Sequence, residues 1–142
     1  MKKYRILVPY VEAGMGHIVT SQAISESLKK LNEPNVEIIC CKAFKDGNDP
    51  VLIKYEKTIV DQVKIANKYA GYGNFQFAMM QLFGPQTSLK FVHSTVFKNI
   101  KKHTMEYFLS FKPDMIVSTH YATTHFAIAL KNKFLPNLIV AT

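Results

Sequence analysis

The sequence predicts an α/β fold, with an open, mainly parallel sheet and helices on both of its faces. Two observations lead to this prediction. Short apolar runs alternate along the chain with longer segments whose apolar residues recur every three or four positions. The segments between them are rich in glycine, proline, asparagine and aspartate, as turns are. At 142 residues the chain can bury a real core, and we expect residues 1–142 to form a single domain.

The first predicted strand occupies residues 5–10. Ile6, Leu7 and Val8 form a continuous apolar run, which is typical of a parallel strand covered on both faces. A turn with two glycines follows, and glycine permits tight turns and the close approach of a ligand to the backbone.

The first predicted helix begins near His17. Its buried face is expected to carry the apolar residues at helical spacing, which are Val19, Ala23, Ile24, Leu28 and Leu31. The free N–H groups at the start of this helix offer a place for a phosphate or diphosphate.

The remaining elements follow in chain order. A second strand at 36–41 completes a βαβ unit. The later segments are a turn-rich loop at 42–50, helices at 51–69 and 95–111, a strand at 115–117, a helix at 122–133 and a strand at 138–140. Because ligands collect at the carboxyl ends of parallel strands, we expect the loops after the first strand and after the 115–117 strand to share one rim.

The formal charge of +8 is concentrated in the second part of the chain. The first fifty residues carry 7 Lys/Arg and 6 Asp/Glu, and the other ninety-two carry 11 and 4. Such charge suits nucleic acid, anionic lipid or a phosphorylated ligand, and does not choose among them. Cys40 and Cys41 are adjacent in a predicted strand, so we expect neither a disulfide nor a metal site from them, in a reducing cytoplasm. We expect no signal peptide and no membrane-spanning segment.

Residues 69–97 are rich in aromatic residues and methionine, and Lys90 is their only formal charge. Such side chains followed by a basic cluster suit contact with an anionic membrane. The residues expected to make this contact are Phe75, Phe77, Met79, Met80, Phe83, Lys98, Lys101 and Lys102. Two alternatives are that the aromatic residues fill the core, or that they stack on nucleic acid, for which no recognised binding motif is present.

The glycine turn does not match two common nucleotide-binding motifs. The dinucleotide fingerprint needs a third glycine or alanine where Val19 stands, and an acidic residue near the end of the second strand, where residues 40–42 are Cys-Cys-Lys. The Gly-Lys-Ser/Thr of a P-loop is absent. What remains is Gly-Met-Gly-His at residues 14–17, with the histidine at the start of a helix.

Two motifs resemble the monogalactosyldiacylglycerol synthase and processive diacylglycerol glucosyltransferase family. One is the Gly-x-Gly-His loop at 14–17. The other is the Pro-Asp, apolar strand, Ser-Thr-His run at 113–120, which the family usually follows with proline and this chain follows with Tyr121. The resemblance covers essentially the whole chain, although the middle matches only in general character. It implies a Rossmann-like domain that is the N-terminal half of a GT-B glycosyltransferase fold, and these residues do not include the C-terminal nucleotide-sugar-binding domain.

The resemblance implies the lipid-acceptor domain of an enzyme that moves a hexose from a UDP-sugar to diacylglycerol in glycolipid synthesis. In the family the histidine of the first motif acts on the acceptor side, which assigns the catalytic role to His17. Histidine suits this role because it titrates near neutrality and can take a hydroxyl proton. The other implied site residues are Gly14, Met15 and Gly16 for the acceptor and diphosphate loop, and Ser118, Thr119 and His120 for the acceptor cleft. Without the resemblance, His17 would be read as a helix-opening residue with local hydrogen bonds.

The implied partners are diacylglycerol and an anionic membrane surface, with no nucleic acid, no metal and no cofactor. The UDP-sugar would be held mainly by the missing C-terminal domain, so we expect the isolated chain to lack efficient transferase activity. The expected location is cytoplasmic and peripheral, on the inner face of the cell membrane. Two alternatives remain open: a non-catalytic membrane- or lipid-binding module of the same fold, and an unrelated Rossmann-like nucleotide-binding domain.

Overall fold

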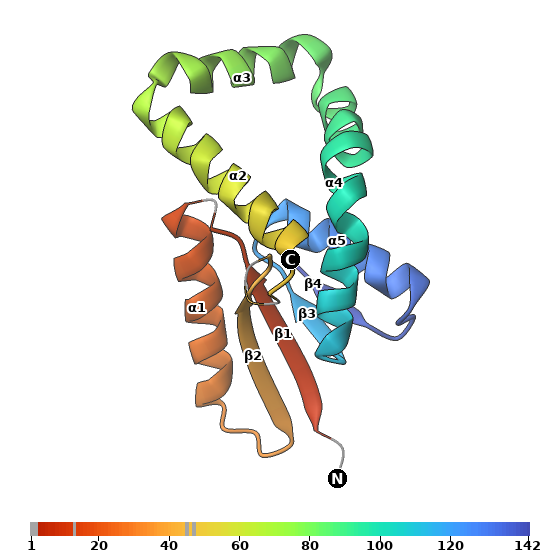
Figure 1. The fold of residues 1–142 in the computed structure, drawn as a ribbon. Coiled ribbons are helices and arrows are strands. Elements are labelled where there is room, and N and C mark those ends of the chain that lie inside the picture. The colour runs from red at the N-terminus through yellow and green to blue at the C-terminus, as the bar shows by residue number, and fades with distance from the viewer. Residues whose placement is uncertain (1–2, 13, 45, 47) are drawn as a thin grey trace.

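The fold class is α/β, as predicted, with a parallel sheet and helices (Figure 1). The structure is a computed structural model that describes residues 3–12, 14–44, 46 and 48–142, without the side chains of residues 70, 76–77, 79–80, 83 and 85–96. In chain order, the elements of the described residues are β1 (Tyr4–Tyr10), α1 (Met15–Lys30), β2 (Val36–Lys42), α2 (Pro50–Lys68), α3 (Ala70–Phe83), α4 (Pro85–Ser110), β3 (Met115–Val117), α5 (Tyr121–Lys133) and β4 (Ile139–Ala141).

The strand order of the sheet is β2-β1-β3-β4, and each pair of neighbours is parallel. Ile6 of β1 stands opposite Ile38 of β2 on one side and Met115 of β3 on the other. The chain runs from β1 through α1 to β2 on one side, and from β3 through α5 to β4 on the other. The order therefore reverses between β1 and β3, and the loops after these two strands diverge at a topological switch point, where ligands bind in open α/β sheets.

The two faces of the sheet are covered by different helices. Alternate residues of a strand point to opposite faces, so Leu7 and Ile6 of β1 lie on different sides. Leu7 belongs to the main core, which lies on the side of α2, α4 and α5. Its largest buried side chains include Phe44, Leu52, Phe97, Phe108, Ile116, Phe126 and Leu130. On the other face, α1 contacts β1 and β2. Helices thus cover both faces, as the sequence predicted.

The buried face of α1 differs from the prediction. Val19 and Leu31 are 54% and 67% exposed and Ala23 is exposed, while Ser21 and Ser25 are buried. Ile24 and Leu28, also expected to be buried, are half-buried. The prediction was wrong because it placed only apolar residues on the buried face of the helix, whereas small polar residues such as Ser21 and Ser25 are also buried there. The hydroxyl of Ser21 can be buried because it bonds to Thr119 on the loop after β3.

The connection between β2 and β3 is a three-helix arch, formed by α2, α3 and α4. Figure 1 shows α2 leaving the sheet, α3 crossing at the far end and α4 returning. The predicted helix at 51–69 corresponds to α2, and the one at 95–111 is the later part of α4. The helix α4 starts earlier than predicted, at Pro85, because Gly84 with φ 74° and ψ 149° ends α3 and proline suits the first helical position. Phe97 is 1% exposed, so the core interpretation is right for this aromatic residue.

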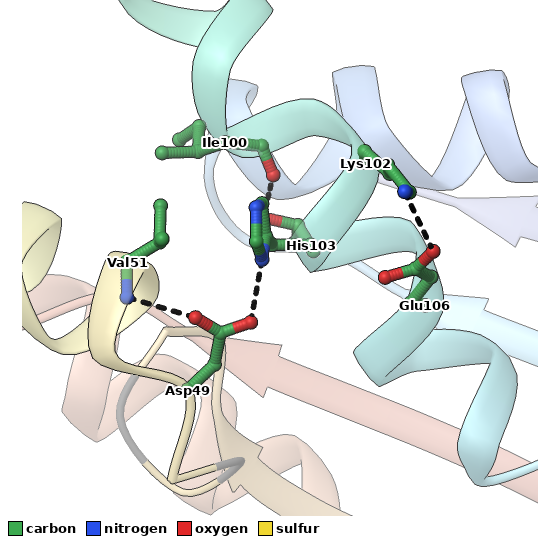
Figure 2. A network of polar contacts seen from close by, with 7 residues as sticks. Asp49, Val51, Ile100, Lys102, His103 and Glu106 are labelled. Carbon is green, nitrogen blue, oxygen red and sulfur yellow. Dashed lines mark hydrogen bonds and ion pairs between the residues drawn. The ribbon is translucent and has the colours of Figure 1, made fainter.

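A polar network joins the two feet of the arch (Figure 2). Asp49 caps α2, because one carboxylate oxygen accepts a hydrogen bond of 2.8 Å from the amide of Val51. The other oxygen lies 2.6 Å from Nδ1 of His103 in α4. The hydrogen bond from His103 stabilises the carboxylate and holds the pKa of Asp49 below its usual value. One carboxylate thus ties the start of α2 to α4.

Candidate functional site

The loop after β1 ends at Gly14, the residue before α1. Its backbone, with φ 121° and ψ 156°, lies in a region that is essentially restricted to glycine. A Cβ atom built at Gly14 or Gly16 would meet no atom within 4 Å, so the described surroundings of both glycines are open. The described first turn of α1 has no side-chain cap and no acidic residue. Its first N–H groups therefore have neither a side-chain nor an intrahelical acceptor.

His17, in the first turn of α1, is tied to the loop after β3. Its Nδ1 atom lies 3.1 Å from the carbonyl oxygen of Thr119. A carbonyl oxygen only accepts, so Nδ1 donates the hydrogen, and in the neutral ring Nε2 carries the lone pair. Ser21, one helical turn further on, bonds through its hydroxyl to Oγ1 of Thr119 at 2.7 Å. The loop after β3 thereby fixes the tautomer and orientation of His17, with Nε2 as the nitrogen that can accept a proton.

His120 is the residue that caps α5. Its Nδ1 atom accepts a hydrogen bond of 3.1 Å from the amide of Ala122, so Nδ1 has no proton and Nε2 carries it. Burial, and to a lesser extent the nearby His17, lower the pKa of His120 to about 4. The ring is therefore neutral near physiological pH and presents an Nε2–H donor.

The rings of His17 and His120 are neighbours. Their centroids are 4.6 Å apart and their planes meet at 81°. The prediction that topology brings these two distant residues to one rim is confirmed, and the rim is the switch point between β1 and β3. Among the contacts made by the described residues, no hydrogen bond engages Nε2 of either ring. The pair thus offers one nitrogen lone pair and one N–H group.

Ser118 occupies a different place from the one predicted. We expected it to line a cleft, but it is 3% exposed. Its hydroxyl bonds to the hydroxyls of Thr123 and Thr124 and to the carbonyl oxygen of His120. Because these bonds lie within the loop and the first turn of α5, Ser118 supports His120 from inside the protein. Thr119, by contrast, uses its carbonyl and hydroxyl to hold His17 and Ser21.

Tyr121 stands where the resembled family has proline. It is the first residue of α5, a position that favours proline and accepts other residues, and the helix begins there. Its ring centroid is 4.5 Å from that of His120. Tyr121 is 57% exposed, and Met15 and Val19, in the first turns of α1, are 71% and 54% exposed. A large exposed ring therefore lies beside His120, and the starts of both helices carry exposed apolar side chains.

The predicted membrane residues belong to the three-helix arch. Phe75 in α3 is 62% exposed. Two residues that the prediction did not include are also exposed, Tyr69 at 57% and Leu82 at 76%. In α4, Lys98 and Lys102 are exposed and Lys101 is half-buried. The side chains of four predicted residues lie outside the description: Phe77, Met79, Met80 and Phe83. Of the helices in the described part of the chain, none combines the length and apolar character needed to cross a bilayer.

Two other features lie outside the histidine pair. A pocket of about 230 Å³ lies where α1 ends and β2 begins, lined by Ile6, Leu28, Val36 and Ile38 among others. The pocket lies toward the amino ends of β1 and β2, whereas the switch point lies at the carboxyl ends of β1 and β3. Where residues are described, no group of three or more His, Cys, Asp or Glu is placed to hold a metal ion. Burial raises the pKa of Cys41 to about 12, which keeps its thiol protonated.

Comparison of the chain with protein-family models, with curated proteins and with solved structures found no match. The fold and the site therefore define only the structural class of the protein. The chain is an α/β, Rossmann-like protein with two histidines in contact at the switch point of its sheet.

Proposed function

We propose that the chain is the acceptor-binding domain of a glycosyltransferase that moves a hexose from a UDP-sugar to diacylglycerol. The observation that carries this proposal is the orientation of His17 by the carbonyl of Thr119. A base must present a free lone pair, and the bond to Thr119 leaves that lone pair on Nε2 of His17. The two motifs that resemble the diacylglycerol glycosyltransferase family supply the substrate class.

In the proposed reaction, Nε2 of His17 takes the proton of the acceptor hydroxyl while the hydroxyl oxygen attacks the anomeric carbon of the sugar. The new C–O bond forms as the bond to UDP breaks, and the departing diphosphate takes the electron pair. The N-terminal end of α1 favours the negative charge of that diphosphate, since its N–H groups have no side-chain acceptor. Gly14 and the first two residues of α1, Met15 and Gly16, are the part of the chain that the diphosphate would approach.

The arch is the proposed membrane contact. Its outermost helix, α3, contains no charged residue, and its exposed Phe75 and Leu82 would insert among lipid chains. Exposed lysines on α4 would meet anionic headgroups. Diacylglycerol resides in such a bilayer, so an acceptor domain that lies on the membrane meets its substrate there.

A non-catalytic lipid-binding module is the second candidate, because α3 alone would suit it. The two candidates differ at His17, since lipid contact by α3 does not need a base. Sugar transfer by a two-domain assembly that fails in the His17→Ala variant would favour the transferase, and transfer that is unchanged in this variant would exclude His17 as the base.

The direct test is co-sedimentation of the purified chain with anionic vesicles, with and without diacylglycerol, at low and high salt. We expect binding that increases with diacylglycerol and survives high salt, because apolar insertion is not screened as charge is. Binding that vanishes with salt and ignores diacylglycerol would contradict an acceptor domain and leave only a basic protein on an acidic surface.

A matched pair of variants locates the contact. Removing the apolar side chains in Phe75→Ser/Leu82→Ser should weaken vesicle binding about tenfold or more, because one buried side chain contributes about 1.5–3 kcal/mol. Phe134→Ser is the control, since Phe134 is 45% exposed and follows α5, outside the helix α3 that is proposed to insert. An equal loss in both variants, or none in the first, would contradict contact through α3.

A further inference from the structure

We propose that His17 and His120 together form a two-point binding site for the hydroxyl group of a neutral alcohol. In this site Nε2 of His17 accepts the hydroxyl hydrogen and Nε2–H of His120 donates to the hydroxyl oxygen. The inference deepens the proposed function by giving His120, a residue implied for the acceptor cleft, the role of a hydrogen-bond donor to the acceptor oxygen. It rests on the proposed function for the identity of the alcohol as the acceptor.

The first step is that the backbone fixes the two rings in opposite tautomers. The carbonyl oxygen of Thr119 requires a hydrogen on Nδ1 of His17, and the amide of Ala122 requires a lone pair on Nδ1 of His120. A backbone carbonyl oxygen can only accept a hydrogen bond, and a backbone amide N–H can only donate one. The Nε2 atoms are therefore of opposite kind, one an acceptor and the other a donor.

The second step is that an alcohol complements this pair. A hydroxyl group donates one hydrogen and accepts at its oxygen, so it can satisfy both nitrogens. An ether oxygen only accepts and leaves the lone pair of His17 without a hydrogen, and an ammonium group only donates and would face the N–H of His120. Two hydrogen bonds of about 3 Å that meet at the tetrahedral angle of one oxygen place their nitrogens about 5 Å apart. The ring centroids are 4.6 Å apart, and the proposal requires that the two Nε2 atoms lie about that far apart on one side of the pair.

The third step concerns what His120 adds to the reaction. A hydrogen bond donated to the acceptor oxygen holds that oxygen beside His17 and stabilises the negative charge that develops as the proton leaves. Thr119 and Ser21 are positioning residues, because they act through the orientation of His17. Exposed Tyr121, whose ring lies against that of His120, gives the pair an apolar neighbour that suits a lipid alcohol.

The tautomers can be tested on the intact chain by nitrogen NMR of the labelled histidines at neutral pH. Single His→Gln variants assign the signals. We expect a hydrogen on Nδ1 of His17 and on Nε2 of His120. Finding the same tautomer in both rings, or a protonated His120, would overturn the inference.

The ligand preference can be tested with small probes that do not depend on membrane binding. The probes are n-hexanol, its methyl ether and hexylammonium, each titrated while the Cε1–H signals of both histidines are followed. We expect n-hexanol to shift both signals saturably and to bind at least fivefold more tightly than either other probe. Equal or tighter binding of the methyl ether or of hexylammonium, or no shift with n-hexanol, would overturn the inference.

Two substitutions at His120 separate its donor from its structural role. Asparagine and aspartate are both good helix caps, so both variants should keep the start of α5. Only His120→Asn keeps an N–H donor, and we expect it to bind n-hexanol within about threefold of the parent, while His120→Asp loses fivefold or more. Equal affinities would overturn the donor role. If the chain bound n-hexanol but its vesicle binding did not increase with diacylglycerol, the proposed function would be contradicted and the alcohol site would stand. The failure of the proposed function can thus be told from the failure of the inference.

Discussion

Substituting alanine for Gly14 should destabilise the protein through backbone strain alone. At φ 121° and ψ 156°, a residue with a side chain costs of the order of 1–3 kcal/mol. No steric clash adds to this cost, because the new Cβ meets no atom within 4 Å. The expected loss in the free energy of unfolding is therefore about 1–3 kcal/mol.

The matched control is Gly16→Ala, two residues further on. Gly16 is inside α1 and a Cβ there also meets no atom within 4 Å. Alanine should stabilise this position by about 0.5–1 kcal/mol, because it loses less conformational freedom in a helix than glycine does. The two variants should thus differ by about 1.5–4 kcal/mol although each adds one methyl group.

Urea unfolding of the parent and both variants, followed by circular dichroism, measures this difference. We expect unchanged m-values and midpoints that move in opposite directions. If Gly14→Ala were neutral or stabilising like its control, the loop before α1 would not have the backbone conformation described here, and the explanation of why glycine stands at this position would fail.

Two further predictions concern titratable groups. His120 has a pKa of about 4 in the folded protein, against 6.5 ordinarily. The unfolded chain therefore binds more protons between these values, and stability should fall as the pH drops from about 6.5 to about 4. Urea midpoints across that range should fall less steeply in His120→Asn, and parallel slopes would contradict the assignment. Asp49→Ala should cost about 1–2 kcal/mol through loss of the α2 cap, and Asp49→Asn less, since asparagine caps well and loses only the charge that faces His103. Equal urea midpoints for these two variants would show that the cap contributes nothing.

Much of the fold could be predicted because the strands are short apolar runs between clear turn signals. The predicted strand at 115–117 matches β3, and the predicted helix at 122–133 differs from α5 by one residue. The helix α3 was not predicted, because Gly71 and Gly73 lower its helix propensity and its apolar residues show no single stripe. It is in contact with the neighbouring helices α2 and α4, and tertiary contacts of this kind can override a low propensity.

The site could be predicted only in part. Topology placed His17 and His120 on one rim, because both follow parallel strands. The role of Ser21 was missed, although its position four residues after His17 puts it on the same helix face. The tautomers depend on which backbone groups face each ring, and a sequence does not contain that information. Ser118 was misplaced because a hydroxyl at a strand end can turn inward as readily as outward.

The bond between His17 and Thr119 also has a consequence for how the protein folds. It joins residues 102 positions apart in the chain. Closing such a long loop is entropically costly, and non-local contacts of this kind form late and slowly. The two histidines can come into contact only after β3 has paired with β1. The connection that must be closed for this pairing includes the whole arch of α2, α3 and α4. The NMR signal of His17 in contact with His120 should therefore appear only in the last stage of folding. Chains that have formed only the β1–α1–β2 unit should lack this signal.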